Sequence, residues 1–222
     1  MNDISYIILA CHIDKGMKSF GSKGLLEFHN KKIFNYQIEW IKKQNHNNYE
    51  IIIISNFDTI KIQRSFSDTI KVVECDTNPI LKGCLESKYN NLIFIDYGCL
   101  FNPKILKKIQ HLKSNYAITI SDINLDIGCI IDHNRISHIY LDLPDHKFSN
   151  IFKLNHTSKL EIINNSIYDR SNLLYFETLN TLINNGNTIE NIIIDKKDFL
   201  YFKHMDQKHA INKFLKRISN PN

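Results

Sequence analysis

Three lysines stand in the polar stretch that follows the first apolar run of the chain. The run over residues 6–10 ends in a small residue, and Lys15, Lys18 and Lys23 follow before an amphipathic segment begins near Phe34. A strand that stops at a basic loop ahead of a helix is a common way to hold phosphates, because both the loop and the helix N-terminus are electropositive. The spacing therefore predicts a phosphate-binding loop. The alternative is that these lysines are simply solvated.

Cysteine and histidine chemistry is less well supported. The chain has five cysteines, Cys11, Cys75, Cys84, Cys99 and Cys129. Their odd number and the lack of C-x-x-C spacing favour buried or loop thiols in a reducing compartment. A catalytic Cys11 beside His12 is the alternative, although sequence neighbours on a loop seldom form a working thiol–imidazole pair. The ten histidines show no H-x-x-x-H or H-E-x-x-H pattern, which argues against a zinc site.

Composition narrows the class of protein. A chain of 222 residues with 43% hydrophobic residues can bury a sizeable core, and no apolar stretch approaches the ~20 residues needed to span a bilayer. Asp3 stands where a signal peptide would carry positive charge, so we expect a cytoplasmic protein without a targeting segment. The net charge of +5 is spread out and not interleaved with aromatic residues. We therefore expect a small phosphorylated partner, neither nucleic acid nor membrane, and leave a homo-oligomer open.

Strand and helix signals alternate in the first half. Apolar runs predict strands over 4–10, 49–55, 71–75, 92–96 and 115–120. The i, i+4, i+7 spacing of Phe34, Ile38 and Ile41 predicts a helix, and Pro79 and Pro103 each mark a helical first turn. This alternation predicts an α/β fold with a Rossmann-like mixed, mostly parallel sheet flanked by helices.

The pattern changes after residue 122. We expect a hairpin over 128–132 and 136–141, irregular structure over 145–159, a strand over 160–168, a helix over 171–184, a short helix from Thr188, a strand over 199–202 and a last helix over 207–218. No linker or repeat divides the chain. The sequence predicts one domain over 1–222, whose more β-rich second half covers the open edge of the sheet.

Five sequence segments occur in the same order as in the nucleotidylyltransferase superfamily and resemble its motifs. The resemblance is strongest to the phosphocholine cytidylyltransferases and the sugar-phosphate nucleotidylyltransferases. Ile7-Ile8-Leu9-Ala10-Cys11 resembles the family's strand before the Gly-rich loop, and Ser22-Lys23-Gly24-Leu25-Leu26 resembles its Pro-Lys-x-Leu segment. The stretch over 30–39 resembles the GKPLIEYQIE segment. The stretch over 94–101 resembles the strand end that carries the first metal-binding aspartate, and His204-Met205-Asp206 resembles the segment that carries the second metal-binding aspartate. The resemblance implies a GT-A-like fold, with residues 1–122 as the nucleotide-binding half and 123–222 as the substrate-side half.

The resemblance also implies roles for particular residues. Lys23 would bind phosphate as a catalytic residue, with Lys15 or Lys18 replacing the family's loop arginine. Leu9, Ala10 and Cys11 would contact the nucleotide, and Asp96 and Asp206 would hold Mg²⁺.

Three further residues have both a functional and a structural interpretation. Asn78 ahead of Pro79 would contact the nucleobase or cap a helix. Asp169 and Arg170, ahead of a predicted helix, would meet the substrate or form a helix cap and a surface ion pair. Asp206 could likewise cap the final helix.

The sequence departs from the family at two places. The Gly-rich loop is degenerate: His12-Ile13-Asp14-Lys15-Gly16 lacks both expected glycines, and Gly16 stands at the arginine position. The family's first aspartate aligns with Gly98, and Asp96 lies two residues earlier, about 7 Å back along a strand. A local shift of the loop could bring Asp96 into place.

These observations favour a divergent nucleotidylyltransferase that transfers a nucleotidyl group from an NTP such as CTP to a sugar phosphate or phosphocholine-like phosphate, for surface polysaccharide synthesis. A catalytically degenerate binding or assembly domain is the second hypothesis. A nucleotide-sugar glycosyltransferase is the third, although Asp96-Tyr97-Gly98 offers only one carboxylate of an Asp-x-Asp pair.

Overall fold

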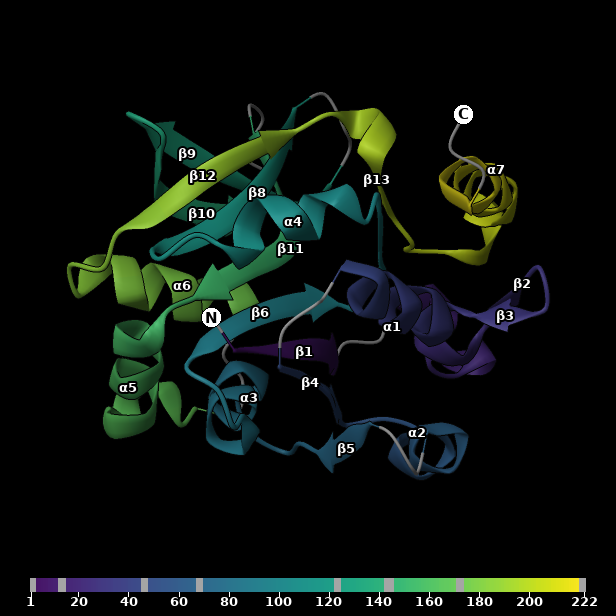
Figure 1. Cartoon of the computed structure of the whole chain (residues 1–222), viewed down its shortest axis with the longest axis horizontal. Coiled ribbons are helices and arrows are strands. Elements are labelled where there is room, and N and C mark those ends of the chain that lie inside the picture. Colours follow the sequence, from purple (N-terminus) through teal and green to yellow (C-terminus); the bar gives the residue numbers. More distant parts are fainter. Residues whose placement is uncertain are drawn as a thin grey trace.

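A nine-stranded mixed sheet forms the centre of the molecule (Figure 1), in a computed structural model that describes residues 3–11, 15–44, 48–66, 70–121, 125–141, 146–170 and 174–219. The strand order is β5 (Lys71–Glu74), β4 (Tyr49–Ser55), β1 (Ile4–Ala10), β6 (Asn91–Asp96), β11 (His146–Leu154), β8 (Asn115–Ser121), β12 (Ile189–Ile194), β10 (Arg135–Leu141) and β9 (Ile127–Asp132). The predicted fold class, an α/β fold with a large mixed sheet, is confirmed.

Helices cover both faces of this sheet because its strands bury alternate side chains on opposite sides. Tyr6 and Ile8 of β1 belong to one apolar cluster, and Ile7 and Leu9 belong to the other. The first cluster includes side chains from α1 (Ile33–Gln44), α2 (Thr59–Phe66), α4 (Lys104–Gln110) and α7 (Lys208–Ser219). The second includes side chains from α3 (Pro79–Glu86), α5 (His156–Asn164) and α6 (Tyr175–Asn184).

The second half of the chain differs from the sequence prediction in three places. The segment expected to be irregular contains β11, which lies antiparallel between β6 and β8. The strand expected over 160–168 is instead α5 followed by the 3-10 turn η3 (Ser166–Tyr168). The short helix expected from Thr188 is β12, which runs parallel to β8.

Two of these differences have a physical reason in the structure. β11 is a central strand with buried polar residues, and its Lys153 ammonium donates to the carbonyls of Gln110 and Leu112. Such a strand lacks a clean apolar pattern. Asn155 caps α5, since its side chain accepts from the Ser158 amide at 3.0 Å. The helix therefore begins earlier than its apolar residues indicate.

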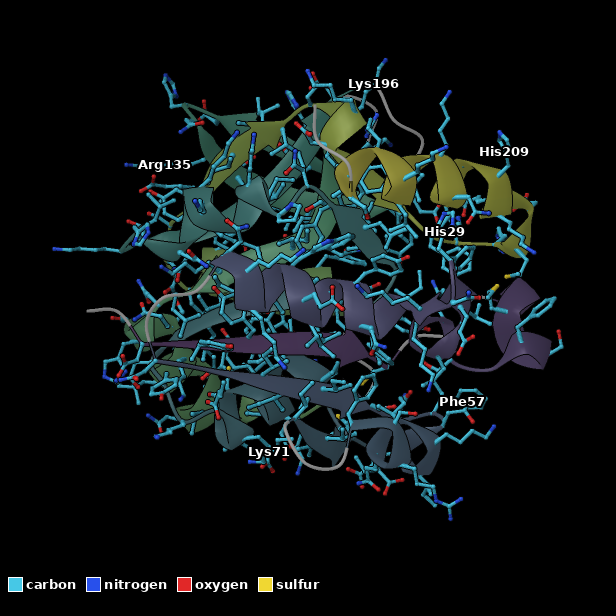
Figure 2. All side chains as sticks on the ribbon, turned by 45° about the vertical axis from the view of Figure 1, so that its right-hand side comes forward. His29, Phe57, Lys71, Arg135, Lys196 and His209 are labelled. Atoms are coloured by element: carbon cyan, nitrogen blue, oxygen red, sulfur yellow. The ribbon has the colours of Figure 1, made fainter. Side chains whose placement is uncertain are left out.

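Two short pairings lie outside the large sheet, and the first brings a late segment to the end of β6. β13 (Phe199–Tyr201) pairs antiparallel with β7 (Cys99–Phe101), and the Phe202 amide donates to Gly98 O at 2.8 Å. β2 (Glu27–Phe28) and β3 (Lys31–Lys32) form a hairpin whose turn residue His29 lies beside α7 (Figure 2), with Nε2 3.4 Å from Asn212 O.

The remaining 3-10 helices are η1 (Lys15–Phe20), η2 (Lys23–Leu25), η4 (Lys196–Asp198) and η5 (Met205–Gln207). Within the described ranges, no helix combines the length and the apolar character that a membrane crossing requires.

Candidate functional site

The carboxyl ends of four parallel strands meet at one edge of the sheet. The register pairs Ala10 with Ser55, Ser55 with Glu74, and Leu9 with Asp96. The chain runs outward from β1 through β4 to β5 and then returns to β6 on the other side of β1, so a topological switch point lies between β1 and β6. Open α/β sheets bind ligands at such a point, outside the carboxyl ends of the strands.

Asp96 ends β6 at this edge and is 1% exposed. Its Oδ1 accepts from the Gly98 amide at 2.7 Å, and its backbone carbonyl accepts from Gln37 Nε2 at 3.1 Å. A β-carbon built on Gly98 would lie only 3.1 Å from Asp96 Oδ1. The carboxylate of Asp96 therefore reaches the space that a side chain at position 98 would fill, which is where the family's aspartate aligns.

Lys23, the first residue of η2, also lies at the end of β6 and is completely buried. Its ammonium donates to Phe202 O at 3.0 Å and lies 5.1 Å and 5.0 Å from the ring centres of Tyr97 and Tyr201. Phe202 O is also 3.0 Å from the β-carbon position of Gly98. The ammonium of Lys23 and the carboxylate of Asp96 thus converge on Gly98.

The pKa of the Cys99 thiol depends on the charges of both Asp96 and Lys23. Burial raises its pKa well above the usual value, Asp96 raises it further, and Lys23 acts in the opposite direction. A buried thiol that is influenced by both groups is consistent with a compact charged centre.

The segment that carries Lys23 is fixed by two contacts. The Ser22 amide donates to Asp58 Oδ2 at 2.9 Å. A β-carbon on Gly24 would lie 2.1 Å from the Phe34 ring, so α1 packs closely on this glycine. These contacts hold Lys23 between the start of α2 and the start of α1.

The other candidate lysines are only partly described. Lys15 and Lys18 belong to η1, but the positions of their side chains lie outside what the structure describes, as do residues 12–14 of the degenerate loop, His12 among them. Their assignment to phosphate binding stays a prediction.

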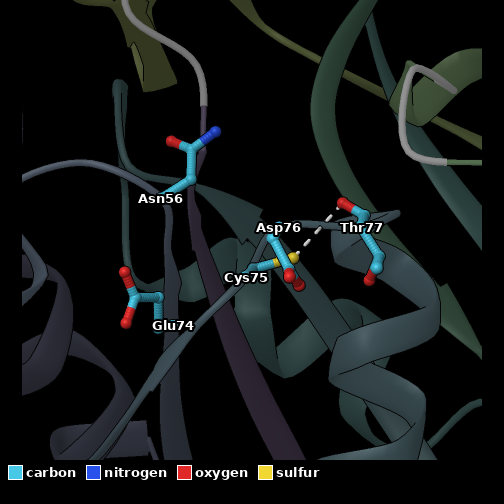
Figure 3. A pocket seen from close by; sticks show the side chains of 5 residues that line it. All are labelled: Asn56, Glu74, Cys75, Asp76 and Thr77. Carbon is cyan, nitrogen blue, oxygen red and sulfur yellow. Dashed lines mark hydrogen bonds between the residues drawn. The ribbon is translucent and has the colours of Figure 1, made fainter.

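A hollow of about 460 Å³ opens beside the ends of β4 and β5 (Figure 3). It is lined by Asn56, Glu74, Cys75, Asp76 and Thr77. The Cys75 thiol donates to Thr77 O at 3.3 Å. The lining is acidic, which disfavours phosphate groups and suits hydrogen-bond donors such as amino and hydroxyl groups.

Cys11, directly after β1, forms a thiol pair with Cys75. The hydrogen bond between the two thiols lowers the pKa of Cys75 to about 7 and raises the pKa of Cys11. While Cys75 is protonated, the Cys11 thiol instead donates its single proton to Ile54 O at 3.3 Å. The pair connects the predicted nucleotide-binding residues Leu9, Ala10 and Cys11 to the hollow.

Asn78 is fully buried and caps α3. Its Oδ1 accepts from the Ile80 and Leu81 amides, and its Nδ2 donates to Tyr168 O at 3.0 Å and to Thr178 Oγ1 at 3.1 Å. The side chain is thus used for capping and for linking α3 to the second half of the chain, as the capping interpretation of the sequence predicted. A contact between Asn78 and a nucleobase stays a prediction.

The remaining candidates lie on the surface. Asp206 is exposed within η5, four residues after Phe202, which contacts the centre. Asp169 and Arg170 follow η3 and are exposed. No cluster of three or more metal-binding side chains occurs in the part of the chain that the structure describes.

Three residues that contact Lys23 or Asp96 were not among the predicted site residues: Gln37, Tyr97 and Tyr201. Gln37 is fully buried, and its Nε2 also donates to Cys99 O at 2.9 Å. A polar residue on the apolar face of a predicted helix, between Phe34 and Ile38, was the available signal for Gln37.

The fold is that of the nucleotidylyltransferases. Neither a protein-family model nor a curated protein matches the sequence. Solved structures do match, among them the inositol-1-phosphate CTP transferase from T. maritima, with 13% identity over 98% of this chain and 96% of that one at a TM-score of 0.76.

Two further structures show the same likeness. One is the CTP:phosphocholine cytidylyltransferase from Streptococcus pneumoniae, with 14% identity, 96% and 99% coverage and a TM-score of 0.75. The other is a nucleoside-diphosphate-sugar pyrophosphorylase from Vibrio cholerae RC9, with 14% identity, 93% and 99% coverage and a TM-score of 0.69. At these identities the likeness establishes the shared fold, and the fold that the sequence resemblance implied is confirmed.

Proposed function

We propose that this chain is a nucleotidylyltransferase that joins a nucleotidyl group from an NTP to a small organic phosphate and releases pyrophosphate. The observation that carries the proposal is the convergence of Lys23 and Asp96 on Gly98, at the edge where such sheets bind ligands. This places a cation and a carboxylate together although the family's aspartate position is a glycine.

The reaction requires little covalent chemistry from the protein. An oxygen of the acceptor phosphate attacks the α-phosphorus, the bond from the α-phosphorus to the bridging oxygen breaks, and pyrophosphate leaves. Catalysis in such reactions rests on positioning and on neutralising charge. Lys23 would contact the phosphates once its ammonium exchanges Phe202 O for a phosphate oxygen.

Mg²⁺ fits the residues present. It is commonly held by one or two carboxylates together with substrate phosphates, so a three-residue cluster is not required. The carboxylate of Asp96 would hold it, with Asp206 from the late segment as the second candidate. When bound, the ion neutralises charge on the phosphates.

The hollow beside β4 and β5 supports a site for the nucleobase or ribose. Carboxylates of Glu74 and Asp76 accept hydrogen bonds, and the amino group of cytosine can donate to them. CTP is therefore the first nucleotide to test. The product, a nucleotide-activated sugar or alcohol phosphate, would serve surface polysaccharide synthesis.

The test is release of pyrophosphate from each NTP with Mg²⁺ and a panel of glucose 1-phosphate, inositol 1-phosphate and phosphocholine. We expect release with at least one combination and a fall of about 10²–10³-fold in Asp96→Asn, which keeps an acceptor for the Gly98 amide but loses the charge. Asp132→Asn, at an exposed aspartate ending β9, is the matched control. No release with any combination would refute the proposal.

A catalytically degenerate binding domain is the rival, and one observation favours it. Lys23 is fully buried and its ammonium already donates to a backbone carbonyl. Under the rival hypothesis the Asp96→Asn variant and the wild-type chain are equally inactive, and any NTP binding is independent of Mg²⁺.

A further inference from the structure

Cys11 and Cys75 stand on opposite sides of the end of β4. Cys11 directly follows β1, and Cys75 directly follows β5. The last residues of these two strands both pair with Ser55 at the end of β4. The Cys75 amide also donates to Ser55 O at 2.9 Å, so Cys75 continues the line of β5 beside β4. The two cysteines therefore lie at one level of the sheet, with a single strand end between them.

The thiols of both residues turn to the same face of the sheet. Cys75 belongs to the apolar cluster under α3, α5 and α6, and Cys11 packs against the same cluster. The Cys11 sulfur lies 3.3 Å from Ile54 O, beside the strand that separates the two cysteines. Once Cys75 ionises, the Cys11 thiol donates to its sulfur instead. The two sulfur atoms are therefore neighbours, although their backbones belong to different strands.

Cys75 is the thiol that small reagents can reach in reactive form. Although little of its surface is exposed, Cys75 lines the hollow (Figure 3), and a pKa of about 7 leaves about half of it ionised at neutral pH. Burial raises the pKa values of Cys84, Cys99 and Cys129, to about 12 for the first and the last. Since the thiolate is the nucleophile, oxidation should select Cys75 among the five cysteines.

We propose that Cys75 is a site of reversible oxidation by peroxides, and that Cys11 is its resolving partner in an intramolecular disulfide. The Cys75 sulfur attacks one oxygen of hydrogen peroxide, the O–O bond breaks, and the other oxygen leaves as water with the proton that Cys75 released. The Cys11 sulfur then attacks the sulfur of the sulfenic acid, the S–O bond breaks, and a second water leaves with the Cys11 proton. The two thiols together lose two electrons, which reduce the peroxide to water.

The disulfide changes the shape of the predicted nucleotide site. A disulfide joins α-carbons that are about 4.4–6.8 Å apart. Residues separated by one intervening strand lie about 9–10 Å apart. Closing the bond therefore pulls the segment after β1 across the end of β4 and toward the hollow. This consequence rests on the proposed function, in which that segment and the hollow hold the nucleotide. Oxidation should thus weaken CTP binding, and bound CTP should in turn slow the oxidation.

The test counts the free thiols of the full chain before and after treatment with stoichiometric hydrogen peroxide, and mass spectrometry identifies the linked peptides. Peroxide should lower the number of free thiols from five to three by joining Cys11 to Cys75, and dithiothreitol should restore all five. Calorimetry should show that the oxidised form binds CTP about 10-fold more weakly than the reduced form, which is within the usual range for coupled sites.

Cys11→Ser removes the resolving thiol. Cys75 should then stop at the sulfenic acid, which dimedone labels, and no disulfide should form. Cys129→Ser, at a buried cysteine of β9, is the matched control and should still lose two thiols to the disulfide. Five free thiols after peroxide, a disulfide that omits Cys75, or unchanged CTP binding in the oxidised form would overturn the inference.

The two proposals fail separately. Pyrophosphate release by the reduced chain, without a disulfide between Cys11 and Cys75 under peroxide, would refute the oxidation site and keep the transferase. If the disulfide forms but the reduced chain neither binds CTP nor releases pyrophosphate from any NTP, the transferase is refuted and the oxidation site stands.

Discussion

Replacing Lys23 with methionine tests whether the buried ammonium holds the candidate site together. Methionine keeps most of the apolar length but removes the charge. The variant loses a hydrogen bond from a charged donor to Phe202 O, a kind of bond that contributes about 1.5–3 kcal/mol. It also loses the contacts with the rings of Tyr97 and Tyr201, which contribute about 1–2 kcal/mol together.

The variant no longer has the cost of removing the ammonium from water, and this offsets part of the loss. The buried carboxylate of Asp96, however, loses a nearby cation, which lowers stability further. We therefore expect Lys23→Met to lower the free energy of unfolding by about 3 kcal/mol. For a chain of this length the melting temperature should fall by about 6–12 °C. Denaturant titration and calorimetry measure the two quantities.

Lys104→Met, at an exposed lysine that begins α4, is the control and should leave stability unchanged. In the double variant with Asp96→Asn, part of the lost stability should return, because the buried negative charge is removed together with the cation. A melting temperature of Lys23→Met within about 1 °C of the wild type would refute the reasoning.

Two further predictions concern the hollow and the cap of α3. Because the pKa of Cys75 is lowered to about 7, the rate of its alkylation by iodoacetamide should rise as pH increases through 7 and level off above it. Cys11→Ala should move the midpoint of this pH profile toward that of an ordinary thiol. An unmoved midpoint would contradict the thiol pair. Asn78→Ala should lower the free energy of unfolding by about 2–4 kcal/mol, since the cap is lost and the buried Thr178 hydroxyl loses its partner. An Asn78→Ala variant as stable as the wild type in denaturant titration would contradict this account.

The parallel half of the fold could be predicted because its signals are local. β1 and β4 are nearly continuous runs of isoleucine and leucine, and Asn78 with Pro79 marks the start of α3. The second half was harder, because β11 buries Lys153 by means of a contact with the end of α4 that no sequence window reveals. α2 was not predicted, since only Thr59 and Ile62 of it are buried.

The candidate site could be predicted only in part for the same reason. The resemblance pointed to Lys23 and Asp96, but the contact of Lys23 with Phe202 spans 179 positions of the sequence. The turn of the Asp96 carboxylate onto the Gly98 amide was expected only as a shift of the loop.

The most direct test of the central claim is a crystal structure of the protein soaked with CTP and Mg²⁺. We predict density for the triphosphate beside Asp96, with the Lys23 ammonium turned from Phe202 O to a phosphate oxygen and the base in the hollow at Cys75. Nucleotide bound elsewhere, or no nucleotide at saturating CTP while Lys23 keeps its contact with Phe202, would contradict the account.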